Sequence, residues 1–434
     1  MSEWALDRAA RSDGVTAVLA LFSTLNHRTC AKLIPATDIS RFQNGGIAFS
    51  GFASGGLGRS KTEPDLVARP DATSYSLWGH THPRIASVQC DVYAGDDLWP
   101  FAPRSILKRH VVEATRLGVI PSIGMELEYY LVAQGGAADT APVLEGKNGG
   151  PYALPDSPSL LAHLATMTAT MDALGWRPEA SMIEAGDAQF ELNFRHGDAL
   201  MTADRVVTLR HLVASAARLQ GWQATFMPKP FTDQPGNGLH LNISLRRGDS
   251  QVFERNSLEA RRDLSEDGLA FVAGIINRAV PNHMVLAPTV NSYKRTYSRF
   301  DRTDGSEVPF CANWGYGDRS KYIRVTTRNV LEVRACDSAA NPYLATAVTL
   351  AAGLEGMRRP RLQSAVTDLT ELQSDGLPRT LLEAADALHS SDEACRALAI
   401  DDGSVGRYYA QAARQEFLKW HNVVSDWERE RYLR

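Results

Sequence analysis

The segment 125–131 constrains the fold more than any other part of the chain, because two acids lie within a run that otherwise favours a strand. The run is rich in apolar and aromatic residues and follows Pro121 and Gly124. Residues two apart on a strand project from the same face. Glu126 and Glu128 therefore share a face, where like charges raise each other's pKa unless a cation lies between them. A solvated edge strand is the alternative interpretation of this segment taken alone.

The same alternation of polar and apolar residues recurs later in the chain and predicts further strands with one polar face. The polar positions are Gln189, Glu191 and Asn193 in segment 189–194, His240, Asn242 and Ser244 in segment 239–245, and Glu332 and Arg334 in segment 330–334. Glu184 stands just before a glycine turn. A lone histidine of this kind usually belongs to the core, but its polar neighbours on the same face favour a site.

Five carboxylates and one imidazole thus lie on or beside strands that are otherwise suited to a core: Glu126, Glu128, Glu184, Glu191, Glu332 and His240. Burying such groups is costly unless they are paired or bind a ligand. Mg²⁺ and Mn²⁺ take carboxylate oxygens and accept an occasional imidazole. Arginines suited to bidentate pairing with phosphate and carboxylate oxygens follow in the sequence, namely Arg295, Arg319, Arg324 and Arg334. Acids, divalent metals and arginines together predict ATP-driven phosphoryl transfer.

Composition excludes several other classes of function. The 434 residues are 44% hydrophobic and 22% charged, as in a globular protein of one large domain or two to three smaller ones. The net charge of -4 argues against a nucleic-acid partner. Five scattered cysteines without a C-x-x-C pair fit a reducing compartment. No apolar run is long enough to predict a membrane span, so we expect a cytoplasmic protein with no membrane partner.

The predicted elements fall into two groups. Strands at 15–22, 30–35 and 88–93 accompany a glycine-rich segment at 45–58, which we interpret as a substrate- or subunit-contact loop because the spacing of a phosphate-binding loop is absent. A proline break at 100–103 marks a domain boundary. Beyond it, helices alternate with strands and a turn at 288–295; the predicted helices are 105–117 with Ser105 as N-cap, 157–174, 202–219, 269–277 and 344–357.

Five blocks, in order, resemble the signature motifs of the glutamine synthetase family. They are E-x-E at 126–128, E-A-G-D-A-Q-F-E at 184–191, G-N-G-L-H-L-N-I-S-L at 236–245, N-S-Y-K-R at 291–295 and L-E-V-R-A-C-D-S-A-A-N-P-Y-L at 331–344. The resemblance covers about residues 15–434. The glycine-rich loop and the L-I-P after Lys32 resemble the branch that includes the γ-glutamylmethylamide synthetases, also called type III glutamine synthetases.

The resemblance implies an α+β protein with a small β-grasp-like N-terminal domain at 1–103. The catalytic domain at 104–434 would contain a curved antiparallel sheet flanked by helices. The resemblance also implies a dodecamer of two hexameric rings, with each active site between two neighbours in a ring. The expected ligands are ATP and L-glutamate as substrates, a small amine as acceptor, and two to three Mg²⁺ or Mn²⁺ ions.

By motif, the resemblance also assigns roles to single residues. Glu128, Glu184 and Glu191 would hold one metal, and Glu126, His240 and Glu332 would hold the second. Arg295, Gly236, Asn237 and Gly238 would contact glutamate, with Arg334 on its carboxylate side. Arg319 and Arg324 would stabilise the transferring phosphoryl group, and with Arg295 and Glu332 they form the expected catalytic set. Asn242 and Ser244 would lie near the adenine, and Arg328 is a candidate nucleotide contact although its spacing is shorter than in the family.

Two departures from ammonia-using members bear on the acceptor. Those members carry a D-G-S-S segment whose acid helps bind ammonium, whereas residues 49–53 contain no acid. They also carry a Glu soon after N-S-Y-K-R, for which Asp301 and Glu307 are the candidates here. Phe52, Tyr297 and Trp314 suggest an apolar pocket that suits an amine with a carbon substituent. We therefore expect methylamine.

Other functions stay open at this point. One is glutamine synthesis from ammonia, another is attachment of a larger amine such as isopropylamine or aniline, and a third is a silent family member acting as scaffold or regulator. Retention of all six presumptive metal ligands argues against a silent member. Segment 368–372 has no tyrosine where the enterobacterial type is adenylylated, so we expect no adenylylation.

Overall fold

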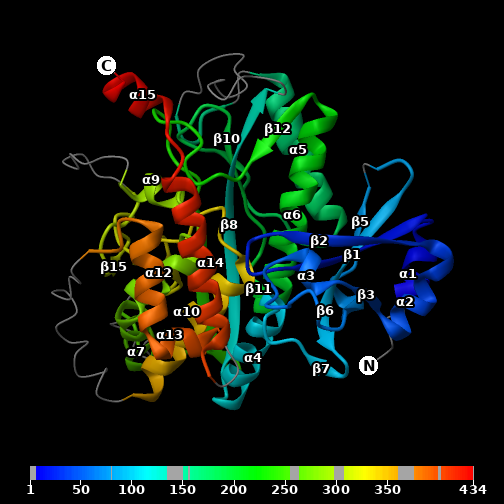
Figure 1. The fold of residues 1–434 in the computed structure, drawn as a ribbon, viewed down its shortest axis with the longest axis horizontal. Helices are drawn as coiled ribbons and strands as arrows, with labels where there is room; N and C mark the ends of the chain where they lie inside the picture. The colour runs from blue at the N-terminus through cyan, green and yellow to red at the C-terminus, as the bar shows by residue number, and fades with distance from the viewer. Residues whose placement is uncertain are drawn as a thin grey trace.

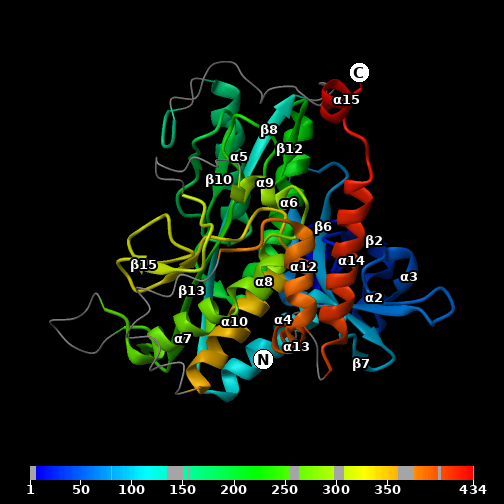
Figure 2. The ribbon, with the colours of Figure 1, turned by 60° about the vertical axis from the view of Figure 1, so that its left-hand side comes forward.

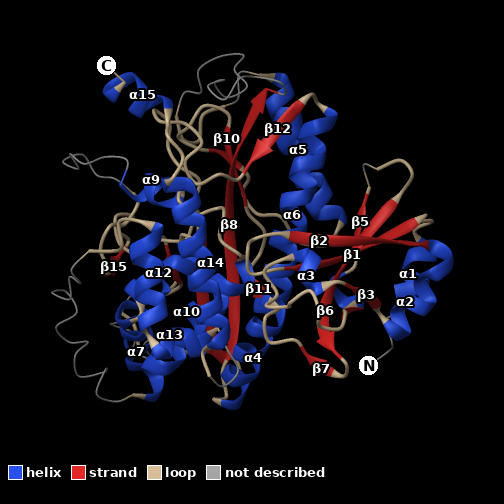
Figure 3. Ribbon diagram, viewed as in Figure 1, coloured by secondary structure: helices blue, strands red, loops and turns tan. Residues whose placement is uncertain are grey.

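The computed structural model describes residues 6–79, 81–133, 150–154, 157–254, 263–297, 307–359, 376–398 and 402–433. Figure 1 shows a smaller β-rich part at the N-terminus, in blue, beside a larger part crossed from end to end by one long strand, β8. The same view coloured by secondary structure separates the strands of the two sheets from the helices that pack on them (Figure 3).

The N-terminal sheet has seven strands with β2, β1, β6, β4 and β3 in that order, and β5 and β7 both pair with β6. Its elements are α1 (Leu6–Ser12), β1 (Ala17–Ser23), β2 (Thr29–Pro35), α2 (Ile39–Gly45), β3 (Ile47–Phe49), α3 (Gly51–Ser54), β4 (Leu66–Pro70), β5 (Ser76–Trp78), β6 (Ile85–Ala94) and β7 (Asp97–Leu98). β1 and β6 are parallel, and the other pairs are antiparallel.

The larger sheet has ten strands with β15, β16, β17, β13, β8, β10 and β9 in that order, while β11 and β12 pair with β8 and β14 pairs with β13. The strands are β8 (Ile120–Ala133), β9 (Met182–Ile183), β10 (Gln189–Leu192), β11 (Gly197–Asp198), β12 (Trp222–Thr225), β13 (Leu239–Arg247), β14 (Ser250–Gln251), β15 (Trp314–Tyr316), β16 (Ile323–Val325) and β17 (Leu331–Val333). All pairs are antiparallel except β15 with β16. The predicted α+β class with a curved, largely antiparallel sheet is thereby confirmed.

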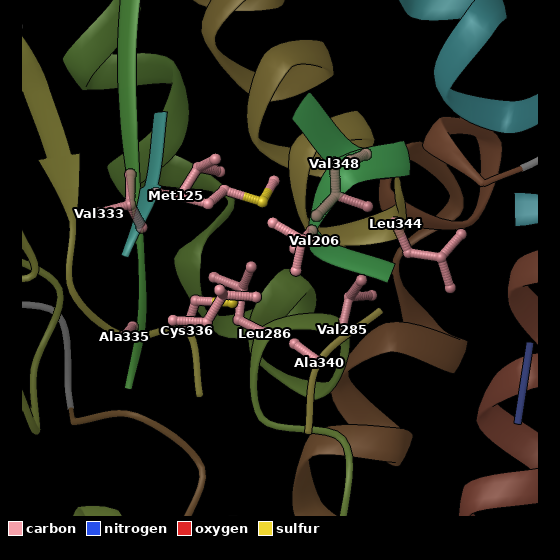
Figure 4. Packing of buried hydrophobic residues seen from close by; sticks show 14 of the residues in the cluster. Met125, Val206, Val285, Leu286, Val333, Ala335, Cys336, Ala340, Leu344 and Val348 are labelled. Carbon is pink, nitrogen blue, oxygen red and sulfur yellow. The ribbon is translucent and has the colours of Figure 1, made fainter. Parts of the chain in front are cut away.

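The helices of this part pack against the sheet or against one another, except the last, which buries no residue. They are α4 (Pro103–Arg116), α5 (Pro158–Ala173), α6 (Ala199–Leu219), α7 (Glu266–Asn277), α8 (Ala279–Leu286), α9 (Ser292–Tyr297), α10 (Pro342–Arg358), α12 (Leu381–Ser390), α13 (Asp392–Ala397), α14 (Ser404–His421) and α15 (Asp426–Tyr432). Figure 2, turned by 60°, shows α8, α10 and α12 side by side and α14 running toward the C-terminus. Met125 of β8 and Val333 of β17 pack there with Val206, Leu286 and Leu344 (Figure 4).

The period of two along β8 explains why both a core and a polar site form on one strand. Met125, Leu127 and Tyr129 are buried in the hydrophobic cluster. Glu126 and Glu128, between them, must project from the opposite face. The alternative of a solvated edge strand is therefore wrong, because β8 is flanked by strands on both sides and Glu128 is only 7% exposed.

The structure corrects the boundaries of several predicted elements. The glycine-rich loop contains β3 and α3, since Ser50 caps a short helical turn by accepting from the Ala53 amide. The helix after the proline break begins at Pro103 with Ala102 as N-cap, not with Ser105, because proline already has the backbone angle of the first helical turn. The predicted turn at 288–295 ends in α9. The domain boundary after residue 103 stays a prediction.

A buried charged cluster joins the two parts of the molecule. The Arg104 guanidinium, 4% exposed, contacts three carboxylates; Asp71 lies at 2.7 Å, Asp91 at 2.5 Å and Asp204 at 2.8 Å. Asp71 and Asp91 belong to the N-terminal sheet region, whereas Arg104 is on α4 and Asp204 is on α6. The cluster therefore fixes how the N-terminal sheet sits on α4 and α6.

Among the described residues no single helix has both the length and the apolar character to cross a membrane, although the bent pair α7 and α8 passes by length and composition only.

Candidate active site

Strand register brings the polar faces together at the centre of the larger sheet. Glu126 of β8 lies opposite His240 of β13, and Glu128 lies opposite Glu191 of β10. On the far side of β13, Glu332 of β17 lies opposite Asn242. Four strands that are distant in the sequence thus place their acids and imidazole on neighbouring positions of one surface. These are the polar faces that alternation predicted.

The first cluster is formed by Glu126, His240 and Glu332, whose ligand atoms all lie within 4.8 Å of one another. His240 Nδ1 is 3.1 Å from Glu126 Oε2 and 3.7 Å from Glu332 Oε1. Asn242 donates to Glu126 Oε1 at 2.9 Å. Burial raises the pKa of Glu126, but the contacts with His240 and Asn242 outweigh it and the net shift is downward. Glu126 is therefore held as a carboxylate.

The second cluster is formed by Glu128, Glu191 and His240, again within 4.8 Å. Glu184 lies outside this trio but hydrogen-bonds to Glu191. Burial and then the charge of Glu128 raise the pKa of Glu184 to about 7. Burial and then Glu126, Glu128 and Glu184 raise the pKa of Glu191 to about 9. Without a cation, these acids therefore retain protons that they would lose in water.

This donor set fits hard divalent cations. Carboxylate oxygens with one imidazole are suitable ligands for Mg²⁺ or Mn²⁺. Without a cation, a retained proton reduces the repulsion between two neighbouring carboxylates. A bound cation would reduce the same repulsion and allow both acids to lose their protons. Glu128, Glu184, Glu191 and His240 would hold one ion and Glu126, His240 and Glu332 another. Bound there, the ions would offset negative charge on phosphate oxygens.

The arginines lie beside Glu332. Arg324 Nη1 is 2.7 Å from Glu332 Oε2, and Arg334, only 2% exposed, pairs with Glu332 Oε1. Arg334 also reaches Glu307 Oε2 at 3.2 Å. Arg319 is exposed on the loop before β16. Its partial burial lowers the pKa of the guanidinium, but the nearby Glu307, Tyr152 and Glu332 outweigh this effect and the net shift is upward. Arg328 is exposed and lies nearer His196, whose pKa is lowered mainly by burial, with a small further contribution from the charge of Arg328.

The segment Gly236, Asn237 and Gly238 passes directly over Glu128. The Gly238 amide donates to Glu128 Oε2 at 2.7 Å. A Cβ on Gly238 would lie 2.9 Å from both Arg295 Nη2 and Glu128 Oε1. Arg295 is buried behind this segment, which lowers its pKa although Glu128 and Asp337 oppose the effect. Only glycine leaves room for the arginine and the acid to face the same space.

Two residues of the site were not singled out as functional by the sequence. Gln189 Nε2 lies within hydrogen-bonding distance of Glu128 Oε2 (3.2 Å), the Gly236 carbonyl (3.0 Å) and Asn237 Oδ1 (3.1 Å). Ser338 donates to the backbone carbonyls of Glu128 and Gly238. Gln189 lies on the predicted polar face and could have been found there, whereas nothing in the pattern around Ser338 marks it.

These residues line a cavity of about 480 Å³. Its walls include Glu128, Glu184, Lys229, Gln234, Gly236, His240, Arg295, Glu307 and Arg334. The cavity therefore presents both carboxylates and guanidinium groups. Such a cavity can hold an amino acid and the phosphates of a nucleotide side by side.

Comparison with known proteins agrees with this geometry. The family model described as the glutamine synthetase catalytic domain matches residues 100–432. The chain is 32% identical to the glutamine synthetase of Rhizobium meliloti over 442 residues, which are 99% of this chain and 99% of the relative. The glutamine synthetase of Mycobacterium bovis is 34% identical over 412 residues, 89% of each chain. The chain belongs to the glutamine synthetase family.

Solved structures support the same assignment. A GmaS/ADP complex has a TM-score of 0.86 at 30% identity, covering 99% of this chain and 99% of that one. Glutamine synthetase of Plasmodium falciparum has a TM-score of 0.85 at 19% identity and shows the shared fold. Members of the family are ATP-dependent ligases that use divalent metals and bind glutamate together with ammonia or an amine. The predicted family, substrate class and use of ATP are thereby confirmed at this level.

Proposed function

We propose that this family member joins the γ-carboxylate of L-glutamate to a small primary amine, with methylamine as the preferred acceptor and ATP converted to ADP and phosphate. The observation that carries the proposal is the likeness to GmaS, a γ-glutamylmethylamide synthetase, over 99% of both chains. The lack of any acid in segment 49–53, where ammonia-using members carry one, supports the choice of an alkylamine.

The roles proposed for single residues are those that the family motifs assign to them. Glu128, Glu184 and Glu191 hold one divalent ion, and Glu126, His240 and Glu332 hold the second. Arg295, Gly236, Asn237 and Gly238 orient the amino acid, with Arg334 at its carboxylate. Arg319 and Arg324 lie toward the transferring phosphoryl group, while Asn242, Ser244 and Arg328 lie toward the rest of the nucleotide. Ions and guanidinium groups together offset the charge that develops on the transferred group.

The reaction has two chemical steps. A γ-carboxylate oxygen of glutamate first attacks the γ-phosphorus of ATP, the bond to the β–γ bridging oxygen breaks, and ADP leaves. The γ-glutamyl phosphate so formed has an electrophilic carbonyl carbon. The lone pair of a neutral amine then attacks that carbon, phosphate departs with the electrons of the C–O bond, and the amine nitrogen loses one proton. Orientation by Arg295 and Arg334 brings the γ-carboxylate and the phosphorus together.

The proposed acceptor pocket includes aromatic side chains. Trp314 is half-buried at the start of β15, and Phe52 of α3 is 52% exposed. Glu307 lines the cavity and pairs with Arg334, which supports it over Asp301 as the replacement for the family's ammonium-site acid. Asp301 and the side chain of Tyr297 lie outside the described residues, as does segment 368–372.

The exposure of Phe52 also supports the proposed assembly. An aromatic side chain that is half exposed on a short helix suits contact with another subunit. We propose two hexameric rings in which the N-terminal part of one subunit closes the site of its neighbour. A cytoplasmic location is part of the same proposal.

The acceptor is tested by measuring ADP formation with saturating ATP, glutamate and Mg²⁺ while the amine is varied. Ammonium, methylamine, ethylamine, isopropylamine and aniline form the series. We expect the highest kcat/KM with methylamine. Equal or better turnover with ammonium would favour glutamine synthesis, the activity named for the curated relatives. No glutamate-dependent ADP formation with any amine would favour a silent scaffold.

A further inference from the structure

Two loops that enter the site from different strands are joined at the mouth of the cavity by Asp187 and Gln234. The Asp187 amide donates to Gln234 Oε1 at 3.1 Å. In return, Gln234 Nε2 donates to Asp187 Oδ2 at 3.2 Å. Because each residue both donates and accepts, the pair helps to fix the separation and the orientation of the two loops, together with Gln189 Nε2 on the Gly236 carbonyl and Asn237 Oδ1.

The two loops carry different parts of the site. Asp187 lies three residues after Glu184 and two before Gln189, in the turn that leads into β10. Gln234 lies two residues before Gly236, in the turn that leads into β13. The first loop therefore carries Glu184, which lies next to the second cluster. The second loop leads into the 236–238 segment, which covers Arg295 and Glu128.

The fold itself does not require this link. β10 and β13 lie on opposite sides of β8, so no strand ladder connects their loops. Asp187 and Gln234 are both half-buried, and neither belongs to a hydrophobic cluster. The pair thus contributes little to the core.

Each loop is also hydrogen-bonded to neighbouring residues of the site, so a displacement of either loop would shift those residues as well. Tyr130 Oη donates to the Pro235 carbonyl at 2.8 Å, and Lys229 Nζ donates to the Gln234 carbonyl. On the other loop, the Gly186 amide donates to Gln189 Oε1 at 3.0 Å. The same Gln189 faces Glu128 through its Nε2. A cation that draws Glu184 and Glu128 together would therefore move the turn that bears Asp187.

We propose that Asp187 and Gln234 are positioning residues that couple cation binding at Glu128, Glu184 and Glu191 to glutamate binding at the 236–238 segment. The inference rests on the proposed function, since it takes both ligands to bind where that proposal puts them. Binding of either ligand sets the distance between the loops and so lowers the entropy lost when the other binds. By linkage, the effect on the two affinities must be equal.

The test uses Mn²⁺ and L-glutamate as probes and the full-length chain. Mn²⁺ binding is measured by titration calorimetry or by the electron paramagnetic resonance signal of free Mn²⁺, with and without saturating glutamate. The readout is the ratio of the two dissociation constants. We expect glutamate to tighten Mn²⁺ binding by roughly tenfold in the wild type and by less than about twofold in Gln234→Ala.

Matched variants separate coupling from simple loss of structure. Asp187→Ala keeps the backbone amide that donates to Gln234 Oε1 but removes the carboxylate acceptor, so it should lose part of the coupling. Asp187→Asn should keep most of it, because the amide oxygen still accepts from Gln234 Nε2. Gln251→Ala, on exposed β14 away from the site, should keep the wild-type ratio. Thermal midpoints recorded for every variant identify any that fails to fold. If Gln234→Ala does not fold, the comparison of Asp187→Ala with Asp187→Asn still tests the inference.

The outcomes distinguish this inference from the proposed function. If the wild type binds Mn²⁺ and glutamate with a coupling that Gln234→Ala and Asp187→Ala leave unchanged, the pair has no coupling role and the proposed function stands. A wild type in which the two ligands bind independently also overturns the inference. If the wild type binds no Mn²⁺, the metal centre of the proposed function fails and the coupling fails with it.

Discussion

Replacing Glu191 by Gln should stabilise the cation-free protein while weakening its stabilisation by metal. Glu191 is 5% exposed, and burial with three neighbouring acids raises its pKa from an ordinary 4.5 to about 9. The folded state therefore binds a proton that the unfolded chain releases above pH 4.5. The cost to stability begins near pH 4.5, grows as pH rises, and levels off above about pH 9.

The size of the effect follows from these values. At pH 7, which is about two and a half units above the unfolded pKa, the folded acid still holds its proton. This lowers the free energy of unfolding by at most about 3 kcal/mol. A glutamine bears no proton to retain, and its Oε1 can still accept from Asn193, which donates to Glu191 at 2.6 Å. For 434 residues the unfolding entropy is about 0.9 kcal/mol per kelvin, so the thermal midpoint should rise by about 3 °C.

The assay is thermal unfolding at fixed protein concentration between pH 5 and 8.5, in EDTA and in Mn²⁺. In EDTA we expect Glu191→Gln to exceed the wild type by a margin that grows with pH. In Mn²⁺ we expect the order to reverse, since the variant loses a ligand of one of the two ions and gains less binding energy than the wild type. Glu430→Gln, an exposed acid on α15, is the matched control and should change nothing. A Glu191→Gln midpoint below the wild type in EDTA at pH 7.5 would refute the reasoning.

Three further predictions test the site and its support. EDTA should destabilise the wild type more at pH 8.5 than at pH 5.5, because ligand carboxylates must be deprotonated to bind a cation; equal shifts in thermal midpoint would count against the metal centre. Gly238→Ala should abolish glutamate-dependent ADP formation, as its Cβ would lie 2.9 Å from Arg295 and Glu128, whereas Gly45→Ala has open space and should keep full activity. Arg104→Ala should cost about 3 kcal/mol or more in denaturant unfolding, because it leaves Asp204 buried without a cation and takes one cation from Asp71 and from Asp91, which keeps Lys108; a cost below about 1 kcal/mol would contradict that role.

The alternation of side chains in the sequence was enough to predict the polar faces of the sheet. A strand has a period of two, so Glu126 and Glu128 had to lie on one face whatever their surroundings. The same period placed Gln189 with Glu191 and His240 with Asn242 and Ser244. The number of acids then indicated that cations bind there, because buried carboxylates are costly unless they are paired with positive charge.

Tertiary structure decided how these faces meet. Register is set by the packing of all neighbouring strands, and a shift by one residue would have turned each acid away from the site. Only the fold could place Glu191 opposite Glu128, Glu332 beside Arg324 and Arg334, and Asp187 against Gln234. The local pattern of residues determines the face of the strand from which a side chain projects. The partner of that side chain depends on contacts between segments that are far apart in the chain.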